Sequence, residues 1–393
     1  MNVRRPFLSA TAMLSLVLFT ACGGSHTATM PTSTTAVVST TSTTVALQPP
    51  SQGVTADLTW VSETHGWALV GQSGCQLTSE VLTTTNSGTS WSEVGSLPSK
   101  ATAIASCNQD DPQTFNIRFG NDIDGYAFNP DLFVTTDGGR SWVQEDGPQV
   151  AALEIAGSDV IRISYTKTGC PGPCDPLVEE APIGSSLWRL LYVIPVQGGR
   201  VQLVRQGPND VYVAVYRNPA GGGQNEQTAL LVSHDGGVTW SQRADPCGYS
   251  GSAENDTEDL AAAPDGVVAV LCFPRLGGPD FVAISSDGGT AFGATASLPG
   301  NVGFQLIAVT NARNVFVATG PNGGGQQVLE ASHDAGDHWN QAASETGQQA
   351  GSYVSPTAGF LGFESPEVGR WIGSPTNIWT TTDGGATWSA LPI

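Results

Sequence analysis

The chain has 393 residues, among them 48 glycines and 25 prolines, and only 13% of its residues are charged. That length exceeds what one ordinary core organises, yet no break in composition divides the second half into separate domains. Acidic residues (35) outnumber basic ones (15), which gives a formal net charge of -20. This balance argues against binding nucleic acid or an anionic membrane through a basic face, because both need clustered Lys and Arg.

The first 21 residues have the organisation of an export signal. Arg4 and Arg5 form a positive start, and residues 7–20 are mostly apolar but too short to predict a membrane span. Residues 18–25, LFTACGGS, resemble the lipobox of bacterial lipoproteins, although Phe19 replaces the usual Leu or Val. The resemblance implies that Cys22 is lipidated and holds the protein at the outer face of the cell membrane. An ordinary secretory signal is the alternative, and Arg4-Arg5 leaves general secretion and twin-arginine export both open.

Residues 22–53 are rich in Thr and Ser, contain Pro31, Pro49 and Pro50, and carry almost no charge. Such a segment has no apolar periodicity with which to offset the entropy of ordering its backbone. We therefore expect a disordered tether, about 30 residues long with a root-mean-square span of roughly 30 Å.

From residue 54 to the C-terminus, one short motif recurs, of which residues 381–388 (TTDGGATW) are the last copy. Six copies keep an Asp or Asn and a closing aromatic residue: Asn86 and Trp91, Asp137 and Trp142, Asp235 and Trp240, Asp287 and Phe292, Asp334 and Trp339, Asp383 and Trp388. The copies lie about 50 residues apart except for one gap of twice that length, which a degenerate copy ending at Trp188 divides. Residues 54–393 therefore contain seven units.

Each unit also contains short runs of β-branched and aromatic residues upstream of the motif. In the first unit these are residues 58–61 and 66–70, a third run enters the motif, and a fourth leaves through its aromatic residue. Four strands in about 49 residues are typical of one propeller blade. The predicted fold is all-β, a seven-bladed β-propeller of four-stranded antiparallel blades over residues 54–393.

The motif has the chemistry of a tight hairpin turn. The Asp carboxylate can accept backbone N–H groups of the residues that follow it, and the Gly two residues later can adopt positive φ without strain. The pattern Ser/Thr-x-Asp-x-Gly-x-Thr-Trp resembles the Asp box, or bacterial neuraminidase repeat. Residues 66–71 with 83–91 also look like the seven-bladed photosystem II stability and assembly factors. In Asp-box proteins the turn is structural, so the resemblance implies a structural role for the twelve motif residues.

Once Cys22 is set aside, six cysteines remain, and an even number in an exported chain suggests disulfides. Neighbours along the sequence pair most simply: Cys75 with Cys107, Cys170 with Cys174, and Cys247 with Cys272. Fifteen connectivities are possible, so this pairing is a hypothesis. Metal binding is the alternative, but the paired C-x-x-C knuckles that it needs do not occur.

A glycan-active enzyme of the exo-sialidase type is the most specific catalytic hypothesis, because Asp boxes are widespread in sialidases. Such enzymes resemble one another in an arginine triad, an Arg-Ile-Pro motif, and a Tyr nucleophile supported by Glu. This sequence has no Arg-Ile-Pro motif, although Arg118, Arg162 and Arg205 near first strands leave a cryptic triad open. We predict no catalytic residue.

Two acidic segments are candidates for cation binding. Asp122 and Asp124 occupy the predicted turn between the first two strands of the second unit, where other units have Asn or Glu, so we predict a structural role. Glu254, Asp256, Glu258 and Asp259 form an acidic insertion that we expect on a loop at the channel mouth. This loop is either solvated or a binding site for a cation or basic partner. The histidines have no metal-ligand spacing, and the prediction contains no metal and no cofactor.

The sequence thus favours a non-catalytic, surface-anchored lipoprotein. Its propeller would act, as a monomer, in the recognition or assembly of an envelope protein or glycan, with no nucleic acid and with membrane contact through the lipid alone. The exo-sialidase hypothesis is the alternative.

Overall fold

The computed structural model describes residues 53–71, 79–98, 114–165, 175–195, 201–216, 228–250, 253–274, 279–293, 296–299, 305–319, 326–346 and 359–393. Regular structure in these residues consists of strands. Within the same ranges, no helix has the length and apolar character needed to span a membrane.

The strands form seven sheets. The first four sheets contain β1 (Val54–Trp60), β2 (Gly66–Gly71), β3 (Ser79–Thr84), β4 (Ser92–Ser96); β5 (Thr114–Phe119), β6 (Gly125–Pro130), β7 (Phe133–Thr135), β8 (Val143–Gln144); β9 (Gln149–Ala156), β10 (Asp159–Tyr165), β11 (Pro176–Pro182), β12 (Arg189–Val193); and β13 (Val201–Gln206), β14 (Asp210–Tyr216), β15 (Thr228–Ser233), β16 (Ser241–Arg243). The last three contain β17 (Tyr249–Ser250), β18 (Ala253–Ala263), β19 (Val267–Pro274), β20 (Phe281–Ser285), β21 (Ala296–Ser297); β22 (Gln305–Val309), β23 (Val315–Thr319), β24 (Gln326–Ser332), β25 (Asn340–Thr346); and β26 (Leu361–Phe363), β27 (Gly369–Ser374), β28 (Asn377–Thr381), β29 (Ser389–Pro392).

Each sheet is an antiparallel meander in which sequence neighbours pair, so each sheet is one blade. Six blades have the four strands that the sequence predicts. Blade 5 has a fifth, because the two-residue strand β17 pairs with the start of β18. The fold is therefore an all-β, seven-bladed propeller, and the prediction of its architecture is confirmed.

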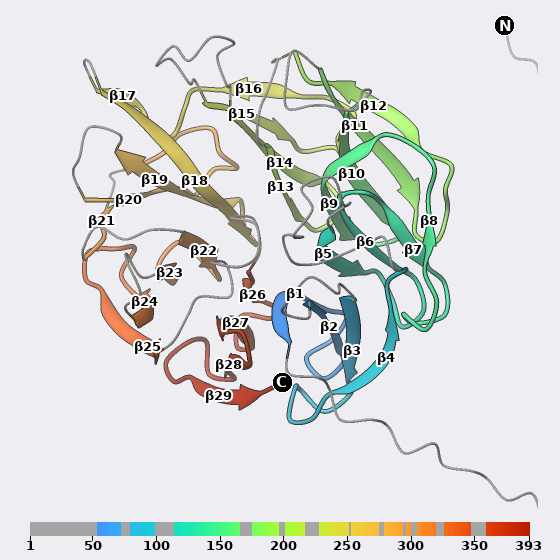
Figure 1. Cartoon of the computed structure of the whole chain (residues 1–393). Coiled ribbons are helices and arrows are strands. Elements are labelled where there is room, and N and C mark those ends of the chain that lie inside the picture. The colour runs from blue at the N-terminus through green and yellow to red at the C-terminus, as the bar shows by residue number, and fades with distance from the viewer. Residues whose placement is uncertain are drawn as a thin grey trace, which may run out of the picture. The chain divides into compact units, whose positions relative to one another are not determined.

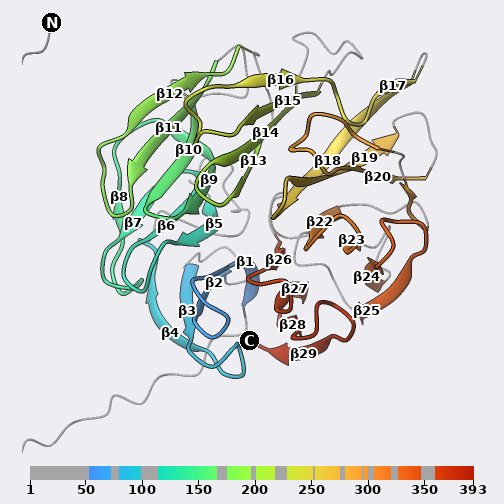
Figure 2. The same cartoon turned by 180° about the vertical axis from the view of Figure 1, so that it is seen from behind.

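The blades follow one another around a central axis, and Figures 1 and 2 show the first strands β1, β5, β9, β13, β18, β22 and β26 nearest to it. The apolar core is divided among the spaces between neighbouring blades. One cluster of buried side chains joins blades 2 and 3, others join 3 and 4, 4 and 5, 5 and 6, and 6 and 7, and a larger one joins blades 7, 1 and 2. Trp67 of β2, for example, stacks on Phe119 of β5 with ring centroids 3.9 Å apart. Each blade is thus stabilised mainly by its neighbours.

The ring closes where blade 7 meets blade 1, and among the described strands none is exchanged between them: β1 to β4 form blade 1 and β26 to β29 form blade 7. Closure depends instead on contacts between the two sheets. Thr55 donates from its backbone N–H and its hydroxyl to the carbonyl oxygen of Pro375, at 3.0 and 2.9 Å. The buried guanidinium of Arg370 in β27 lies 4.4 Å above the ring of Trp60 and donates to the carbonyl oxygen of Glu63 at 3.0 Å.

The recurring motif is the turn between the third and fourth strands of each blade. In blade 2, Asp137 accepts the N–H of Ser141 at 2.9 Å and the hydroxyl of Thr135 at 2.8 Å, while Trp142 donates to the carbonyl of Gly139 at 3.0 Å. Gly138 and Gly139 have φ of 77° and 92°, a region that glycine enters without strain. Equivalent Asp or Asn bonds occur in blades 1, 4, 5, 6 and 7. The motif therefore fastens hairpins.

Blade 3 has lost the Asp of this turn and holds its aromatic residue differently. Trp188 donates from its indole N–H to Glu145, at the end of blade 2, at 2.6 Å. The buried guanidinium of Arg162 lies 3.9 Å from the centre of the same ring and pairs with Glu179 at 2.9 Å and Glu145 at 3.2 Å. An ion-pair cluster that reaches into the neighbouring blade has replaced the local turn.

The acidic segment predicted as a loop is instead part of a strand. Residues 253–263 form β18, in which Asn255 pairs with Pro274 and Asp256 with Phe273. The prediction from local polarity was wrong, because the long partner strand β19 extends the pairing into this acidic stretch. The side chains of Glu254, Asp256 and Glu258 lie outside the described part of the structure; that of Asp259 is described below.

Candidate functional site

The first strands surround a central cavity of about 530 Å³. Polar side chains on its wall include Asn116, Arg118, Glu154, Arg205 and Asp259 in blades 2 to 5 and Glu364 in blade 7. Apolar side chains predominate in blades 6 and 7, among them Leu306, Phe360 and Leu361. This cavity is the candidate functional site, because residues from all seven blades line it and charged groups from several blades gather in it.

Asp57 organises one side of the cavity wall. It directly follows a bulge in β1, and its buried carboxylate accepts the N–H of Ile117 at 3.0 Å and the side-chain amide of Asn116 at 3.2 Å. Arg118 donates to the same oxygen at 2.7 Å and to Glu154, in blade 3, at 3.0 Å. One ion-pair chain therefore joins blades 1, 2 and 3.

Burial dominates the electrostatics of this chain. Desolvation raises the pKa of Asp57 and the pKa of Glu154 above their ordinary values, although Arg118 opposes both shifts. Burial alone would lower the pKa of Arg118, but the carboxylates of Glu154 and Asp57 raise it above its ordinary value. Arg118 therefore stays a cation, and its charge is neutralised within the wall.

Asp259 has the same place in blade 5 that Asp57 has in blade 1. It too directly follows a bulge in its strand, and it accepts the N–H of Ile307 in blade 6 at 2.9 Å. Its other oxygen accepts the amide of Gln202, in blade 4, at 2.9 Å. Of the four acidic residues predicted to form a binding loop, Asp259 thus links three blades.

Arg205 of β13 forms no ion pair within the described structure, although Glu180, Asp159 and Glu154 act on it at longer range. Its two terminal nitrogens donate to the carbonyl oxygens of Asp159, at 2.8 Å, and Pro208, at 3.1 Å. Its Nε is buried without a hydrogen-bond partner, and within the described residues no acidic oxygen lies within 4 Å of it. Burial lowers the pKa of Arg205.

Glu364, which follows β26, is the corresponding unsatisfied acid. Neither of its carboxylate oxygens has a hydrogen-bond partner in the described structure, and Arg370 is the nearest cation, 3.6 Å away. Burial raises the pKa of Glu364 to about 8, against the opposing effect of Arg370. This group belongs to both the cavity wall and the seam between blades 7 and 1.

The three arginines that the sequence left open as a sialidase triad do not converge. Arg118 and Arg205 line the cavity, but Arg162 lies in β10, the second strand of blade 3, and is buried in the ion-pair cluster beneath Trp188. No tyrosine is among the residues that the described structure places on the cavity wall. Arg162 was therefore wrongly grouped with first-strand residues.

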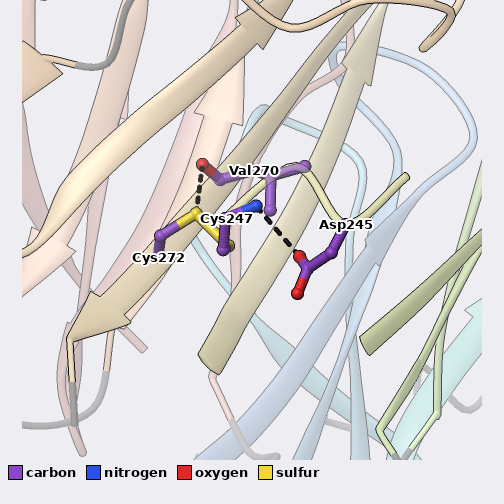
Figure 3. The surroundings of a disulfide bond; sticks show 4 residues. All are labelled: Asp245, Cys247, Val270 and Cys272. Atoms are coloured by element: carbon purple, nitrogen blue, oxygen red, sulfur yellow. Dashed lines mark hydrogen bonds between the residues drawn. A yellow bond between two sulfur atoms is a disulfide. The ribbon is translucent and has the colours of Figure 1, made fainter. Parts of the chain in front are cut away.

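The other predicted sites are resolved only in part. Cys247 and Cys272 form a disulfide that ties the connection after blade 4 to β19, and Figure 3 shows Asp245 next to it, accepting the N–H of Cys247 at 2.9 Å. This agrees with the predicted pair. Cys22, Cys75, Cys107, Cys170 and Cys174 lie outside the described residues.

Asp122 and Asp124 lie in the turn between β5 and β6, as predicted. Asp122 pairs with the imidazole of His65 at 2.9 Å, and Asp124 accepts the side-chain amide of Asn121, also at 2.9 Å. Across the ranges that the structure describes, no group of three or more His, Cys, Asp and Glu residues has a metal-binding arrangement.

Sequence reasoning missed Asp57, Glu154 and Glu364. Asp57 carried a usable signal, since an isolated Asp inside a run of otherwise apolar first-strand residues needs a buried partner. Glu154 carried none, because its partner Arg118 comes from another blade, and Glu364 carried none, because its burial depends on the packing of the folded ring.

Comparison with known proteins agrees with this architecture. The BNR/Asp-box repeat model matches residues 231–242, the turn of blade 4. No curated protein matches the sequence.

Among solved structures, the chain is similar to YCF48 bound to a D1 peptide, with 19% identity, a TM-score of 0.52, and coverage of 84% of this chain and 93% of that one. It is also similar to a PL25 ulvan lyase, a polysaccharide lyase bound to a GlcA–Rha3S saccharide, with 10% identity, a TM-score of 0.53, and coverage of 87% and 96%. The propeller domain of the Trilobed protease from Pyrococcus furiosus gives 8% identity, a TM-score of 0.50, and coverage of 87% and 98%. Since all three identities are below 25%, these likenesses concern the fold alone.

Proposed function

We propose that the chain is a non-catalytic lipoprotein, anchored through Cys22 at the outer face of the cell membrane. Its propeller serves as a recognition or assembly scaffold for an envelope protein or glycan. Residues 1–21 would be removed as a signal peptide, and residues 22–53 would hold the propeller clear of the membrane.

One observation carries the proposal: the charged side chains of the cavity wall are engaged mainly with one another and with the backbone of neighbouring blades. Arg118 is neutralised by Asp57 and Glu154, and Asp259 accepts a backbone N–H of the next blade. A catalytic carboxylate or arginine must instead be available to the reacting atoms. These groups are arranged to lock blades together.

The similarity to YCF48 supports a protein as the partner. That propeller binds a D1 peptide, so a blade arrangement of this kind accommodates a polypeptide ligand. The net charge of -20 favours a partner with a basic contact surface, because opposite charges steer association.

The proposal is tested by proximity labelling from the full chain in its native cells. The expected result is repeated recovery of one or a few envelope proteins, and their loss when a Cys22→Ala variant releases the chain from the membrane. Metabolic labelling with a fatty-acid analogue should mark the wild type and not the Cys22→Ala variant. Repeated absence of a specific partner would contradict the scaffold, and labelling of the variant would contradict the anchor.

A glycan-active hydrolase of the exo-sialidase type is the second candidate. One observation favours this activity, namely that Arg118, Arg205 and Glu154 line the cavity. Turnover of a fluorogenic sialoside by the purified propeller decides the matter. If turnover occurs and is lost in an Arg118→Met variant that remains folded, the non-catalytic proposal is wrong.

A further inference from the structure

The outer strands of the blades differ in character, and one of them is apolar. Six outer strands are short or rich in polar residues: β4 (SEVGS), β8 (VQ), β16 (SQR), β21 (AS), β25 (NQAASET) and β29 (SALP). The seventh, β12 of blade 3, is RLLYV, with four apolar residues in succession. It also ends its sheet, so in the described structure only its inner edge is paired, with β11.

Two of the four apolar residues of β12, Leu190 and Val193, belong to none of the buried clusters. The other two do pack against a neighbouring blade. Leu191 and Tyr192 pack toward blade 4, where Tyr192 stacks on Trp240 with centroids 5.6 Å apart. Leu190 is paired with Glu179 and Val193 with Leu177, so both share the face from which Glu179 contacts Arg162. That face is turned toward blade 2, and on it Leu190 is 52% exposed and Val193 is 43% exposed.

Blade 2 leaves this face uncovered because its outer strand β8 has only two residues. Two further exposed aliphatic side chains belong to the neighbouring segments: Val143 of β8 is 70% exposed, and Leu187, which precedes Trp188, is 82% exposed. The hydrogen bond from Trp188 to Glu145 holds these two segments together. We call Val143, Leu187, Leu190 and Val193 the blade 2–3 rim.

From this arrangement we propose that the free edge of β12 binds an extended segment of a partner protein as an added β-strand, with the blade 2–3 rim receiving its apolar side chains. This inference rests on the proposed scaffold function and names the surface and the kind of partner that it would use.

The edge itself selects a polypeptide. An unpaired strand edge presents N–H and C=O groups at the spacing of another strand, and only a peptide backbone returns both in register. Glycans and lipids do not match that spacing.

The size of the edge favours a linear segment over a second copy of this chain. A five-residue strand is roughly 17 Å long. An added strand therefore covers a few hundred Å², on the order of half of the ~800 Å² per partner in a stable interface between folded proteins. Glu145 and Glu179 lie on the side of blade 3 that faces blade 2 and share one cation, Arg162, which leaves this side with an excess of negative charge. Basic residues between the apolar ones therefore suit the segment best.

The test uses the purified propeller and a fluorescent seven-residue peptide of alternating Val and Lys. Its control is the same peptide with every second amide N-methylated, which keeps the side chains and removes one edge of backbone donors. Fluorescence anisotropy at physiological salt should show saturable binding of the first peptide and at least tenfold weaker binding of the second. Absence of saturable binding, or equal binding of both peptides, overturns the proposal.

Matched variants locate the site. Leu190→Lys with Val193→Lys should weaken binding at least tenfold, because both side chains are exposed on the rim. Ser389→Lys with Ala390→Lys adds the same charge to exposed positions of β29 and should change binding less than twofold. Equal weakening of binding by both pairs of substitutions overturns the assignment. The assignment is also overturned if the wild type sediments as a dimer and the Leu190→Lys, Val193→Lys variant as a monomer, because a second copy of the chain would then occupy the edge.

The same variants separate this inference from the scaffold function. If the Leu190→Lys, Val193→Lys protein still labels the wild-type partner in native cells, the β12 edge is not its binding surface, although the scaffold function stands. If the wild type labels no partner, the scaffold function fails, while the peptide titration still decides whether β12 accepts a strand.

Discussion

A few buried side chains hold neighbouring blades in register, and Asp57 is the best example. Its buried carboxylate accepts a backbone N–H from β5, an amide N–H from Asn116 and a charged hydrogen bond from Arg118. Each bond crosses from blade 1 to blade 2, so the residue stabilises the ring more than its own strand.

Replacement of Asp57 by Asn should therefore lower the free energy of unfolding by about 3 kcal/mol, because the change keeps the shape but removes half of the neutralisation of Arg118. Chemical denaturation measures the effect. Asp122→Asn is the matched control: this exposed carboxylate pairs only with His65 on the surface, so its loss should cost about 0.5 kcal/mol or less. Equal effects of the two substitutions would show that Asp57 is not a link between blades.

The pKa values of the Asp-box carboxyl groups are lowered by hydrogen bonds within the turn. The hydroxyl of Thr239, followed by its backbone N–H and the hydroxyl of Ser233, lowers the pKa of Asp235 to about 2 from 3.8. Hydrogen bonds to the charged form have this effect even at the surface.

Since the folded-state pKa is depressed, the stability that Asp235 contributes is complete above pH 3.8 and is lost as the pH falls through about 2. A carboxyl-detected NMR titration should place the midpoint of Asp235 near pH 2. Thr239→Val should move that midpoint upward by removing the first of these bonds. An unchanged midpoint in the variant would mean that another group sets the acidity.

At the scale of single elements, blade 3 differs from the other six blades because its turn between the third and fourth strands has lost the Asp box. Where the Asp box is intact, the turn needs only the residues within it. Where it is lost, Arg162, Glu145 and Glu179 form a buried cluster around Trp188 that depends on blade 2. Blade 3 is also the blade whose outer strand is apolar, which is why its rim is the proposed docking surface.

The connection between blades 4 and 5 has a covalent fastening. The bond from Cys247 to Cys272 closes a sequence separation of 25 residues. The chain-entropy model assigns a loop of this size about 3 to 4 kcal/mol of stabilisation.

Cys247→Ala with Cys272→Ala should therefore lower the unfolding free energy by about 2 to 4 kcal/mol. The comparison is made by denaturation with and without dithiothreitol. Dithiothreitol should lower the unfolding free energy of the wild type, which has this bond, by more than that of the double variant, which lacks it. If reductant acts equally on both proteins, this bond contributes nothing measurable.

For the whole molecule, the decisive feature is that blades 7 and 1 meet without sharing any of the strands that the structure describes. The seam between blades 7 and 1 depends on two hydrogen bonds from Thr55 to the carbonyl of Pro375, on apolar contacts, and on the guanidinium of Arg370 packed over the ring of Trp60. Glu364 lies beside Arg370, and neither of its carboxylate oxygens has a hydrogen-bond partner among the described residues, so the seam contains a buried group that can gain or lose a proton.

This group gives the ring a specific pH dependence. Burial raises the pKa of Glu364 from 4.5 to about 8, so the folded protein keeps a proton that the unfolded chain releases above pH 4.5. The contribution of Glu364 to stability is therefore complete below pH 4.5 and is lost as the pH rises through about 8. Glu364→Gln, which stays neutral, should match the wild type near pH 5 and be the more stable protein at pH 9. Denaturation curves at both pH values test this, and parallel pH profiles would contradict it.

The sequence by itself determined the number of blades, the antiparallel meander and the structural role of the Asp box. The physical reason is that the hydrogen bonds of each turn close within eight residues, so a local pattern repeated at a constant period specifies them. It also indicated the pairing of Cys247 with Cys272, which are neighbours among the cysteines.

Only the tertiary structure decided what the cavity contains and where the surface is uncovered. Asp57 meets Arg118 across 61 positions, and Arg370 meets Glu63 across 307, through contacts that occur once and leave no periodic trace. The acidic segment at 254–259 was misread because its polarity suggested a loop, whereas pairing with β19 decided its conformation. Local chemistry thus specifies each turn, and the arrangement of blades around the axis decides which side chains meet.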